Sequence, residues 1–138
     1  MATAHEEIDV AADPDTVWAA LRDFGAVDTR LAPGFVTACR LDGDGTRVVR
    51  FVNGAEVREA LVSIDDERRR LAYTVVESAL GATHHHASAH VEPLPDGTSR
   101  FVWITDVLPD DLAAPIGALM RQGLDAVKAA QEGAAIAR

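Results

Sequence analysis

A glutamate and a histidine in apolar segments are the residues of this sequence best suited to proton-transfer chemistry. Glu59 follows Val57 by two positions, and His85 precedes Ala87 by two. Because residues two apart in a strand share one face, both polar groups are expected among apolar side chains. If Glu59 and His85 converge, they form an acid/base pair or anchor the polar end of a ligand. The alternative is a glutamate at a strand edge and a histidine at the rim, both bonded to solvent.

The histidine-rich segment 84–90 is a second candidate for chemistry. His84, His86 and His90 fall on one strand face, and two of them are two residues apart, as metal ligands often are. That face is predicted to be exposed, and no carboxylate completes an inward cluster. Surface histidines are therefore the favoured interpretation, with only adventitious Zn²⁺ or Ni²⁺ binding. The chain also lacks a glycine-rich phosphate loop and a nucleophile elbow, so no metal and no cofactor are predicted.

Length and composition favour one globular domain over residues 1–138. Thirteen Lys and Arg against 22 Asp and Glu give a net charge of −9, which disfavours nucleic acid and anionic membranes as partners. Cys39 is the only cysteine, so an internal disulfide is excluded. No apolar run approaches the ~18 residues of a membrane span. A cytoplasmic protein without membrane insertion is expected.

The first third of the chain predicts one strand and two short helices. Residues 5–11 alternate polar and apolar side chains, as a half-buried strand does. Asp13 is predicted to cap a helix that has Pro14 at its first position and extends to about residue 22. Residues 24–32 predict a second short helical stretch, which Pro33-Gly34 ends.

The remainder predicts a strand meander followed by a long helix. Turn signals such as Asp42–Gly45, Asn53-Gly54 and Pro95–Gly97 separate strands expected at 35–41, 46–52, 56–64, 69–77, 84–93 and 99–107. Asp110 and Asp111 are predicted to cap the final helix. One side of that helix carries Leu112, Ile116, Leu119, Met120, Leu124 and Val127. These elements predict an α+β fold in which a seven-stranded, curved antiparallel sheet wraps around the C-terminal helix.

The odd-numbered side chains of the later strands are the more apolar set and are predicted to face the helix. They are Phe35, Thr37, Cys39, Leu41, Val49, Phe51, Val57, Glu59, Leu61, Ser63, Leu71, Tyr73, Val75, His85, Ala87, Ala89, Val91, Phe101, Trp103 and Thr105. Small residues face one another across this interface, on the strand at 84–93 and on the helix at Gly117, Ala118 and Gly123. They leave room for a ligand cavity, unless the two elements pack closely together.

Three segments resemble a known family. They are 13–27, the strand pair with its Glu59-x-Leu61 pattern, and the Asp65-Asp66-Glu67 turn before an aromatic strand. Together with Trp103 they resemble the bacterial polyketide cyclase/dehydrase and lipid-transport proteins of the START and birch-pollen-allergen superfamily, over most of the chain. The resemblance implies a helix-grip fold whose cavity holds apolar or aromatic ligands. Related plant hormone receptors carry a carboxylate-binding lysine where this chain has Thr37, which argues against a carboxylate-anchored ligand.

Three functions follow from this reading. The leading hypothesis is a carrier or sensor that binds a small hydrophobic or aromatic molecule. The second is a polyketide cyclase or dehydratase in which Glu59 or His85 moves a proton, and the third is a regulatory module whose loops engage another protein. The residues predicted to contact the ligand are Thr37, Val49, Phe51, Glu59, Leu61, Tyr73, Val75, His85, Ala87, Phe101, Trp103, Leu119, Met120, Gly123 and Leu124.

Overall fold

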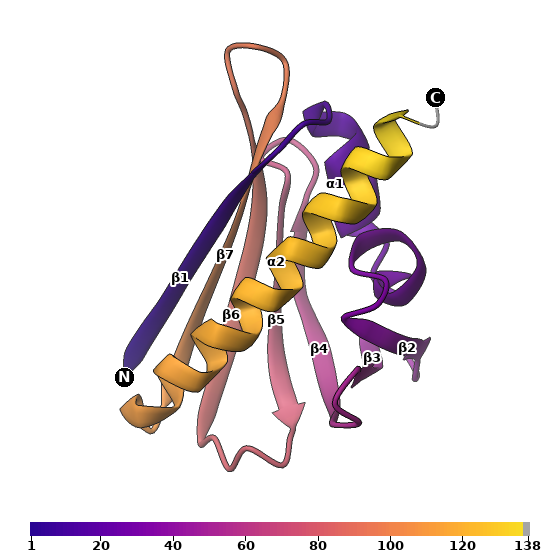
Figure 1. Cartoon of the computed structure of the whole chain (residues 1–138). Helices are drawn as coiled ribbons and strands as arrows, with labels where there is room; N and C mark the ends of the chain where they lie inside the picture. The colour runs from indigo at the N-terminus through magenta and orange to yellow at the C-terminus, as the bar shows by residue number, and fades with distance from the viewer. Residues whose placement is uncertain (137–138) are drawn as a thin grey trace.

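Seven antiparallel strands form one sheet in the computed structural model, which describes residues 1–136. In order across the sheet they are β1 (Ala2–Val10), β7 (Ser99–Leu108), β6 (His84–Pro93), β5 (Arg70–Glu77), β4 (Glu56–Asp65), β3 (Thr46–Phe51) and β2 (Val36–Leu41). The long helix α2 (Ala113–Ile136) runs diagonally across one face of this sheet (Figure 1). The arrangement confirms the predicted α+β helix-grip fold.

Two short helices lie between β1 and β2, as predicted. Asp13 caps α1 (Pro14–Arg22), and one of its carboxylate oxygens accepts a hydrogen bond from the backbone nitrogen of Thr16 at 3.0 Å. The second helix, η1 (Val27–Leu31), is shorter than the predicted stretch and is a π-helix, because the backbone nitrogen of Ala32 donates to the oxygen of Val27. Helix α1 packs against β5 and β6, and η1 packs against β2 and α2.

The edge strand β2 departs from the predicted alternation. Its register with β3 shifts between Val36 and Ala38, which leaves Thr37 as the extra residue of a bulge. Thr37 is exposed, and its hydroxyl donates to the backbone oxygen of Arg50 at 3.4 Å. At the end of the same strand Leu41 is 60% exposed. The prediction that Thr37 faces the helix is therefore wrong, because the bulge turns it outward. After the bulge, Cys39 and Leu41 pair with the inward-facing Val49 and Arg47 and keep the predicted face, although Leu41 at the strand end is largely open to solvent.

A second irregularity changes the inner face of β4. The register with β5 shifts between Leu61 and Ser63. Ser63 is exposed, whereas Ile64 packs against the core. The predicted inward position of Ser63 is wrong for the same physical reason, since one inserted residue moves the following side chains to the opposite face.

The start of the final helix also differs from the prediction. A 3-10 turn, η2 (Asp110–Leu112), precedes α2, and no side chain caps it. The carboxylate of Asp110 instead pairs with the amino group of Met1 at 2.9 Å. The predicted capping role of Asp110 and Asp111 is therefore wrong: β1 and η2 lie close enough for the chain terminus to take up Asp110.

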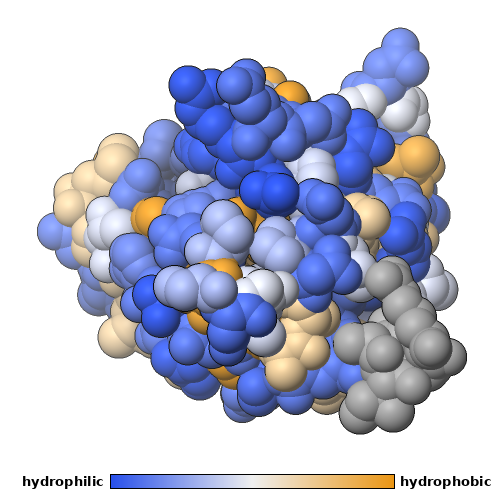
Figure 2. All heavy atoms as spheres, turned by 90° about the horizontal axis from the view of Figure 1, so that it is seen from above, coloured by the Kyte–Doolittle hydropathy of each residue, from blue (hydrophilic) through white to orange (hydrophobic). Residues whose placement is uncertain are grey.

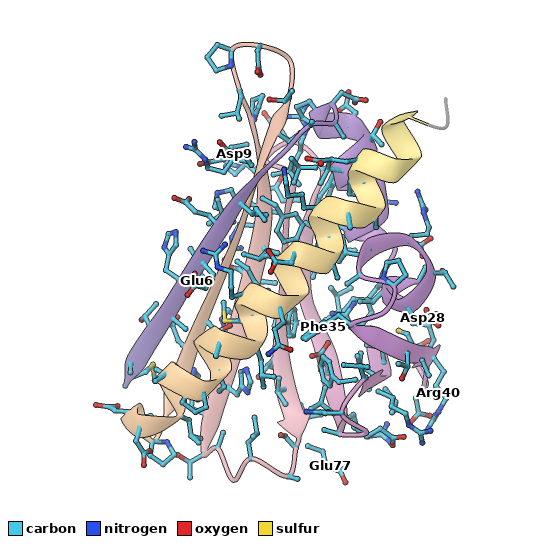
Figure 3. The ribbon with its side chains drawn as sticks, in the orientation of Figure 1. Glu6, Asp9, Asp28, Phe35, Arg40 and Glu77 are labelled. Carbon is cyan, nitrogen blue, oxygen red and sulfur yellow. The ribbon has the colours of Figure 1, made fainter. Side chains whose placement is uncertain are left out.

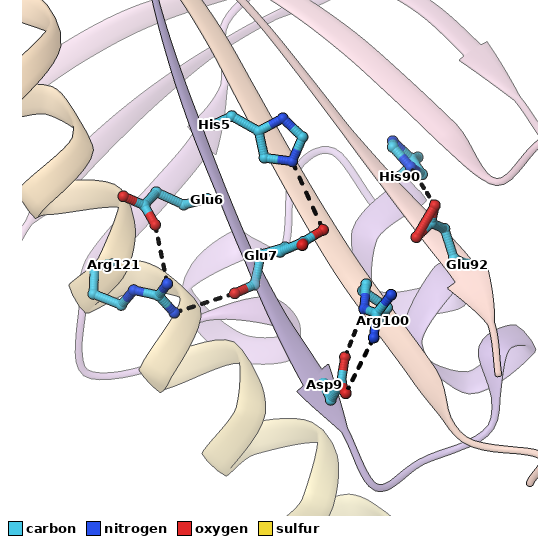
Figure 4. A network of polar contacts seen from close by, with 8 residues as sticks. All are labelled: His5, Glu6, Glu7, Asp9, His90, Glu92, Arg100 and Arg121. Atoms are coloured by element: carbon cyan, nitrogen blue, oxygen red, sulfur yellow. Dashed lines mark hydrogen bonds and ion pairs between the residues drawn. The ribbon is translucent and has the colours of Figure 1, made fainter.

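Polar contacts fix α2 to the edge strand β1 (Figure 4). Arg121 donates to the carboxylate of Glu6 at 3.0 Å and to the backbone oxygen of Glu7 at 3.2 Å. About two turns further on, Lys128 donates to the backbone oxygen of Asp9 at 3.0 Å. Exposed ion pairs contribute only about 0–1 kcal/mol each, so the apolar packing beneath α2 supplies most of the energy that holds it.

The core lies between the sheet, α1 and α2. Its most completely buried large side chains include Leu71 in β5 and Met120 and Leu124 in α2. The surface at the end seen from above is mainly hydrophilic, with small separate apolar areas (Figure 2). None of the helices within residues 1–136 has both the length and the apolar character needed to cross a membrane.

Candidate functional site

A cavity of about 200 Å³ lies between α2 and the inner face of the sheet, and we call it the outer cavity. Residues 52–55 after β3 and residues 78–80 after β5 contribute to its rim. Glu77, labelled in Figure 3, marks the end of the molecule where this rim lies. The walls are mostly apolar and include a few polar groups, a composition typical of small-molecule sites.

A second space of about 60 Å³, the inner cavity, lies deeper, towards α1 and η1. Leu21 in α1 and Val27 and Leu31 in η1 line it. The two cavities share part of their walls. The shared residues are Phe35, Phe51, Glu59, Tyr73 and Trp103.

Most of the residues predicted to contact a ligand lie on these walls. The outer cavity is lined by Phe51, Glu59, Tyr73, Val75, His85, Trp103, Leu119 and Met120. The inner cavity is lined in addition by Val49, Phe101 and Gly123. Four predicted residues, Thr37, Leu61, Ala87 and Leu124, line neither cavity. Thr37 is turned out by the bulge in β2, and Ala87 and Leu124 are fully buried in the core.

A buried ion pair that was not predicted from the sequence stands at the junction of the cavities. Arg47 in β3 and Glu59 in β4 are direct cross-strand partners, and Arg47 Nε donates to Glu59 Oε1 at 2.8 Å. Their side chains are only 8% and 7% exposed. The guanidinium also donates to the backbone oxygen of Phe24 and lies 4.0 Å and 5.2 Å from the ring centres of Phe24 and Tyr73. These contacts compensate the burial of both charges.

Tyr73 and Trp103 form a second polar contact on the shared wall. The indole Nε1 of Trp103 donates to the hydroxyl oxygen of Tyr73 at 3.2 Å. Burial, reinforced by the negative charge of Glu59, raises the pKa of Tyr73 well above its ordinary value. The phenol therefore stays protonated at neutral pH. Since its oxygen accepts from Trp103, its hydrogen is the part that can be donated to a ligand.

His85 carries an unsatisfied polar atom at the wall of the outer cavity. Its Nδ1 is buried and has no hydrogen-bond partner within residues 1–136. Burial lowers the pKa of His85, and the charge of the neighbouring His84 lowers it further. At neutral pH the imidazole is therefore neutral. A buried nitrogen without a partner costs about 1–3 kcal/mol, so a ligand that bonds to it gains by relieving that cost.

Glu59 and His85 lie on the same cavity but not next to each other. Glu59 pairs with Val75 across β4 and β5, and the register between β5 and β6 places Val75 beside His85. Neighbouring strands are about 4.8 Å apart, so the two backbones are separated by about 10 Å. No hydrogen bond or ion pair joins the two side chains in the described part of the chain. They offer polar groups on either side of Val75.

The other histidines of β6 lie on the opposite face of the sheet. His84 is exposed, and His86 and His90 are partly exposed. His90 Nε2 lies 3.5 Å from a carboxylate oxygen of Glu92, a contact that Figure 4 shows. These three side chains are therefore separated from the cavity by the sheet itself.

Comparisons with solved structures place the fold among known proteins. A protein from Thermobifida fusca is 30% identical and has a TM-score of 0.74, with 93% of this chain and 88% of that chain covered. The Zhui aromatase/cyclase from Streptomyces sp. R1128 is 21% identical (TM-score 0.75; 94% and 93% covered). Norcoclaurine synthase from Thalictrum flavum, in complex with dopamine and hydroxybenzaldehyde, is 24% identical (TM-score 0.68; 91% and 83% covered). At identities below 25% the likeness shows a shared fold.

Comparison at the level of sequence shows the family as well as the fold. No curated protein sequence matches this chain. The sequence profile of a family described as polyketide cyclase/dehydrase and lipid transport, however, matches residues 1–132, which is nearly the whole chain. The chain therefore belongs to the polyketide cyclase/dehydrase and lipid transport family.

Proposed function

We propose that this protein binds a small, mainly apolar aromatic molecule in the outer cavity and acts as its carrier or sensor. The observation that carries the proposal is the cavity of about 200 Å³ between α2 and the sheet, with apolar walls and a few polar groups. An apolar protein cavity of about 150 Å³ is known to hold benzene. The outer cavity therefore suits a molecule of one or two rings.

The polar groups suit a ligand with a hydroxyl or carbonyl group. Only one carboxylate oxygen of Glu59 is occupied by Arg47, and the Tyr73 hydroxyl has a hydrogen to donate. The wall therefore offers an acceptor and a donor. The aromatic ligands in the norcoclaurine synthase complex and the aromatase/cyclase activity of the Zhui protein support this ligand class.

Binding of 2-naphthol tests the proposal. The chain has two tryptophans, so a Trp18→Phe background leaves Trp103 as the only one. Because Trp103 lines the outer cavity, 2-naphthol is expected to quench its fluorescence saturably, with one molecule per chain by calorimetry. Retention of a small molecule through purification, seen by native mass spectrometry, would identify the natural ligand class.

Two variants of neighbouring residues test whether 2-naphthol binds in the outer cavity. Val75→Phe adds a ring to the cavity wall and is expected to weaken 2-naphthol binding about tenfold or more, a loss of about 1.4 kcal/mol or more. Val76→Phe is the control, since Val76 is the next residue, points to the other face and is 54% exposed. Equal affinities in these two variants, or no saturable binding by the parent protein, would contradict the proposal.

A second candidate function is proton abstraction by His85, which its buried and unpartnered Nδ1 favours. The neutral imidazole accepts an α-proton from a bound ketone, and the electrons of the broken C–H bond form an enolate to which Tyr73 donates a hydrogen bond. The imidazolium exchanges its proton with solvent and then gives a proton to the carbon, which restores the ketone. Exchange of the α-protons of 1-indanone in D₂O, followed by NMR, tests this step.

The expected exchange rate depends on pH and on His85. Because the base is the neutral imidazole and the pKa of His85 is lowered, the rate rises with pH below the ordinary histidine value and is level at neutral pH. His85→Gln is expected to reduce the enzymatic acceleration by about 100-fold. His5→Gln, on β1 with a 53% exposed side chain, is the control. No acceleration over buffer, or equal loss in both variants, argues for binding alone.

A further inference from the structure

Two aromatic rings stand between the outer and inner cavities. Phe35 lies just before β2 and Trp103 lies in β7, and both side chains line both cavities. Phe35 precedes the last strand of the sheet order, Trp103 lies in the strand next to the opposite edge, and both rings approach Gly123 of α2. Figure 3 shows Phe35 beside this helix. We call these two rings the partition.

The partition rests on a glycine of α2. A Cβ at Gly123 would lie 3.0 Å from Phe35 Cε2 and 3.0 Å from Trp103 Cζ3. Carbon atoms normally pack at about 3.5–4.0 Å, so only a residue without a side chain lets both rings approach this closely. At Gly117 of the same helix, by contrast, a Cβ would meet nothing nearer than the Ala4 Cβ at 3.7 Å. Glycine inside a helix costs roughly 0.5–1 kcal/mol relative to alanine. The close approach of both rings explains why position 123 is glycine, and no such close approach occurs at Gly117.

Both rings are also held from the side of the sheet. The Phe35 ring packs edge-on against Phe51 with ring centres 5.3 Å apart. The indole of Trp103 is fixed by its hydrogen bond to Tyr73. Each ring therefore has one contact with the helix and another with the sheet. These contacts hold both rings of the partition in place.

We infer that Phe35 and Trp103, seated on Gly123, set the length of ligand that this protein accepts. The partition stops a ligand at the end of the outer cavity and keeps it from the inner cavity. A compact molecule of one or two fused rings fits, and an elongated molecule of similar polarity is excluded. The inference rests on the proposed binding function and adds the residues that determine its specificity.

Two phenols of different length test the partition: 2-naphthol, which is compact, and 4-phenylphenol, which is elongated. The Trp18→Phe parent is expected to prefer 2-naphthol. Phe35→Leu removes one ring of the partition and keeps Trp103 as the reporter, so it is expected to raise the affinity for 4-phenylphenol relative to 2-naphthol by about tenfold, as the additional apolar burial predicts. Thermal melting of each variant shows that it is folded.

Adding a methyl group at position 123 is expected to reverse that gain. In the Phe35→Leu background, Gly123→Ala places its Cβ in the opened passage and should lower the relative affinity for 4-phenylphenol again by at least about threefold, a loss of roughly one methyl-sized contact. Gly117→Ala in the same background is the matched control and should leave the ratio unchanged.

The results separate this inference from the function on which it rests. If the parent protein binds 2-naphthol but Phe35→Leu leaves the ratio of the two affinities unchanged, the partition does not set ligand length. The same conclusion follows if Gly117→Ala and Gly123→Ala reduce the ratio equally. If neither phenol binds to the parent or to Phe35→Leu, the proposed binding function itself is overturned.

Discussion

Replacing Arg47 by methionine is expected to lower the free energy of unfolding by about 3–5 kcal/mol. Glu59, 7% exposed, would remain in the interior without its counter-charge. The backbone oxygen of Phe24 would also lose its guanidinium donor and keep only the weak contact with the Cys39 thiol at 3.8 Å. Because methionine roughly retains the volume of the arginine stem, the loss reports the missing charge rather than a large cavity. Urea unfolding at pH 7, followed by circular dichroism, measures it.

Two further variants show whether burial is the cause. Arg50→Met, on the same strand, removes an arginine whose pair with Glu56 is exposed (57% and 48%), and it should cost no more than about 1 kcal/mol. The double variant Arg47→Met/Glu59→Met should recover most of the loss of Arg47→Met, since no isolated charge remains. Equal costs for the two single arginine variants would mean that the ion pair contributes no more than a surface contact.

The inward position of Arg47 could be predicted from the sequence. It shares the odd-numbered face with Val49, and the turn at Asn53-Gly54 sets a register that places Arg47 opposite Glu59. The predicted inward glutamate required a partner, and cross-strand pairing supplies one. Arginine is usually exposed, so the residue type alone does not indicate that Arg47 is buried.

The side-chain orientations that could not be predicted from the sequence are caused by β-bulges. The turn signals correctly separated the strands, and Asp13-Pro14 correctly marked the start of α1. Nothing in the residues of β2 marks Thr37 as inserted, because the bulge depends on how the edge strand meets β3. The π-helical form of η1 is similar: its hydrogen bonds depend on packing against β2 and α2.

The sequence predicts which face of each strand lines the cavities, but not which residues of that face do so. Alternation along a strand identifies which side chains point inward, and it placed Tyr73 and Val75 on the inner face, where both line the outer cavity. It does not say which inward side chains touch open space and which touch other side chains. Ala87, on the same face, is completely enclosed, because the filling of the interior depends on the curvature of the sheet and the path of α2.

Two leucines of α2 that were both predicted to contact a ligand should respond differently to truncation. Leu124 is 0% exposed and packs in the core, so Leu124→Ala is expected to lower the free energy of unfolding by about 2–5 kcal/mol. Leu119 is partly exposed and lines the outer cavity, so Leu119→Ala should cost clearly less and instead weaken 2-naphthol binding. Urea unfolding and calorimetric titration of both variants measure the two effects. If Leu119→Ala destabilises the protein as much as Leu124→Ala and leaves the affinity unchanged, that stretch of α2 is core packing and the outer cavity is not where the ligand binds.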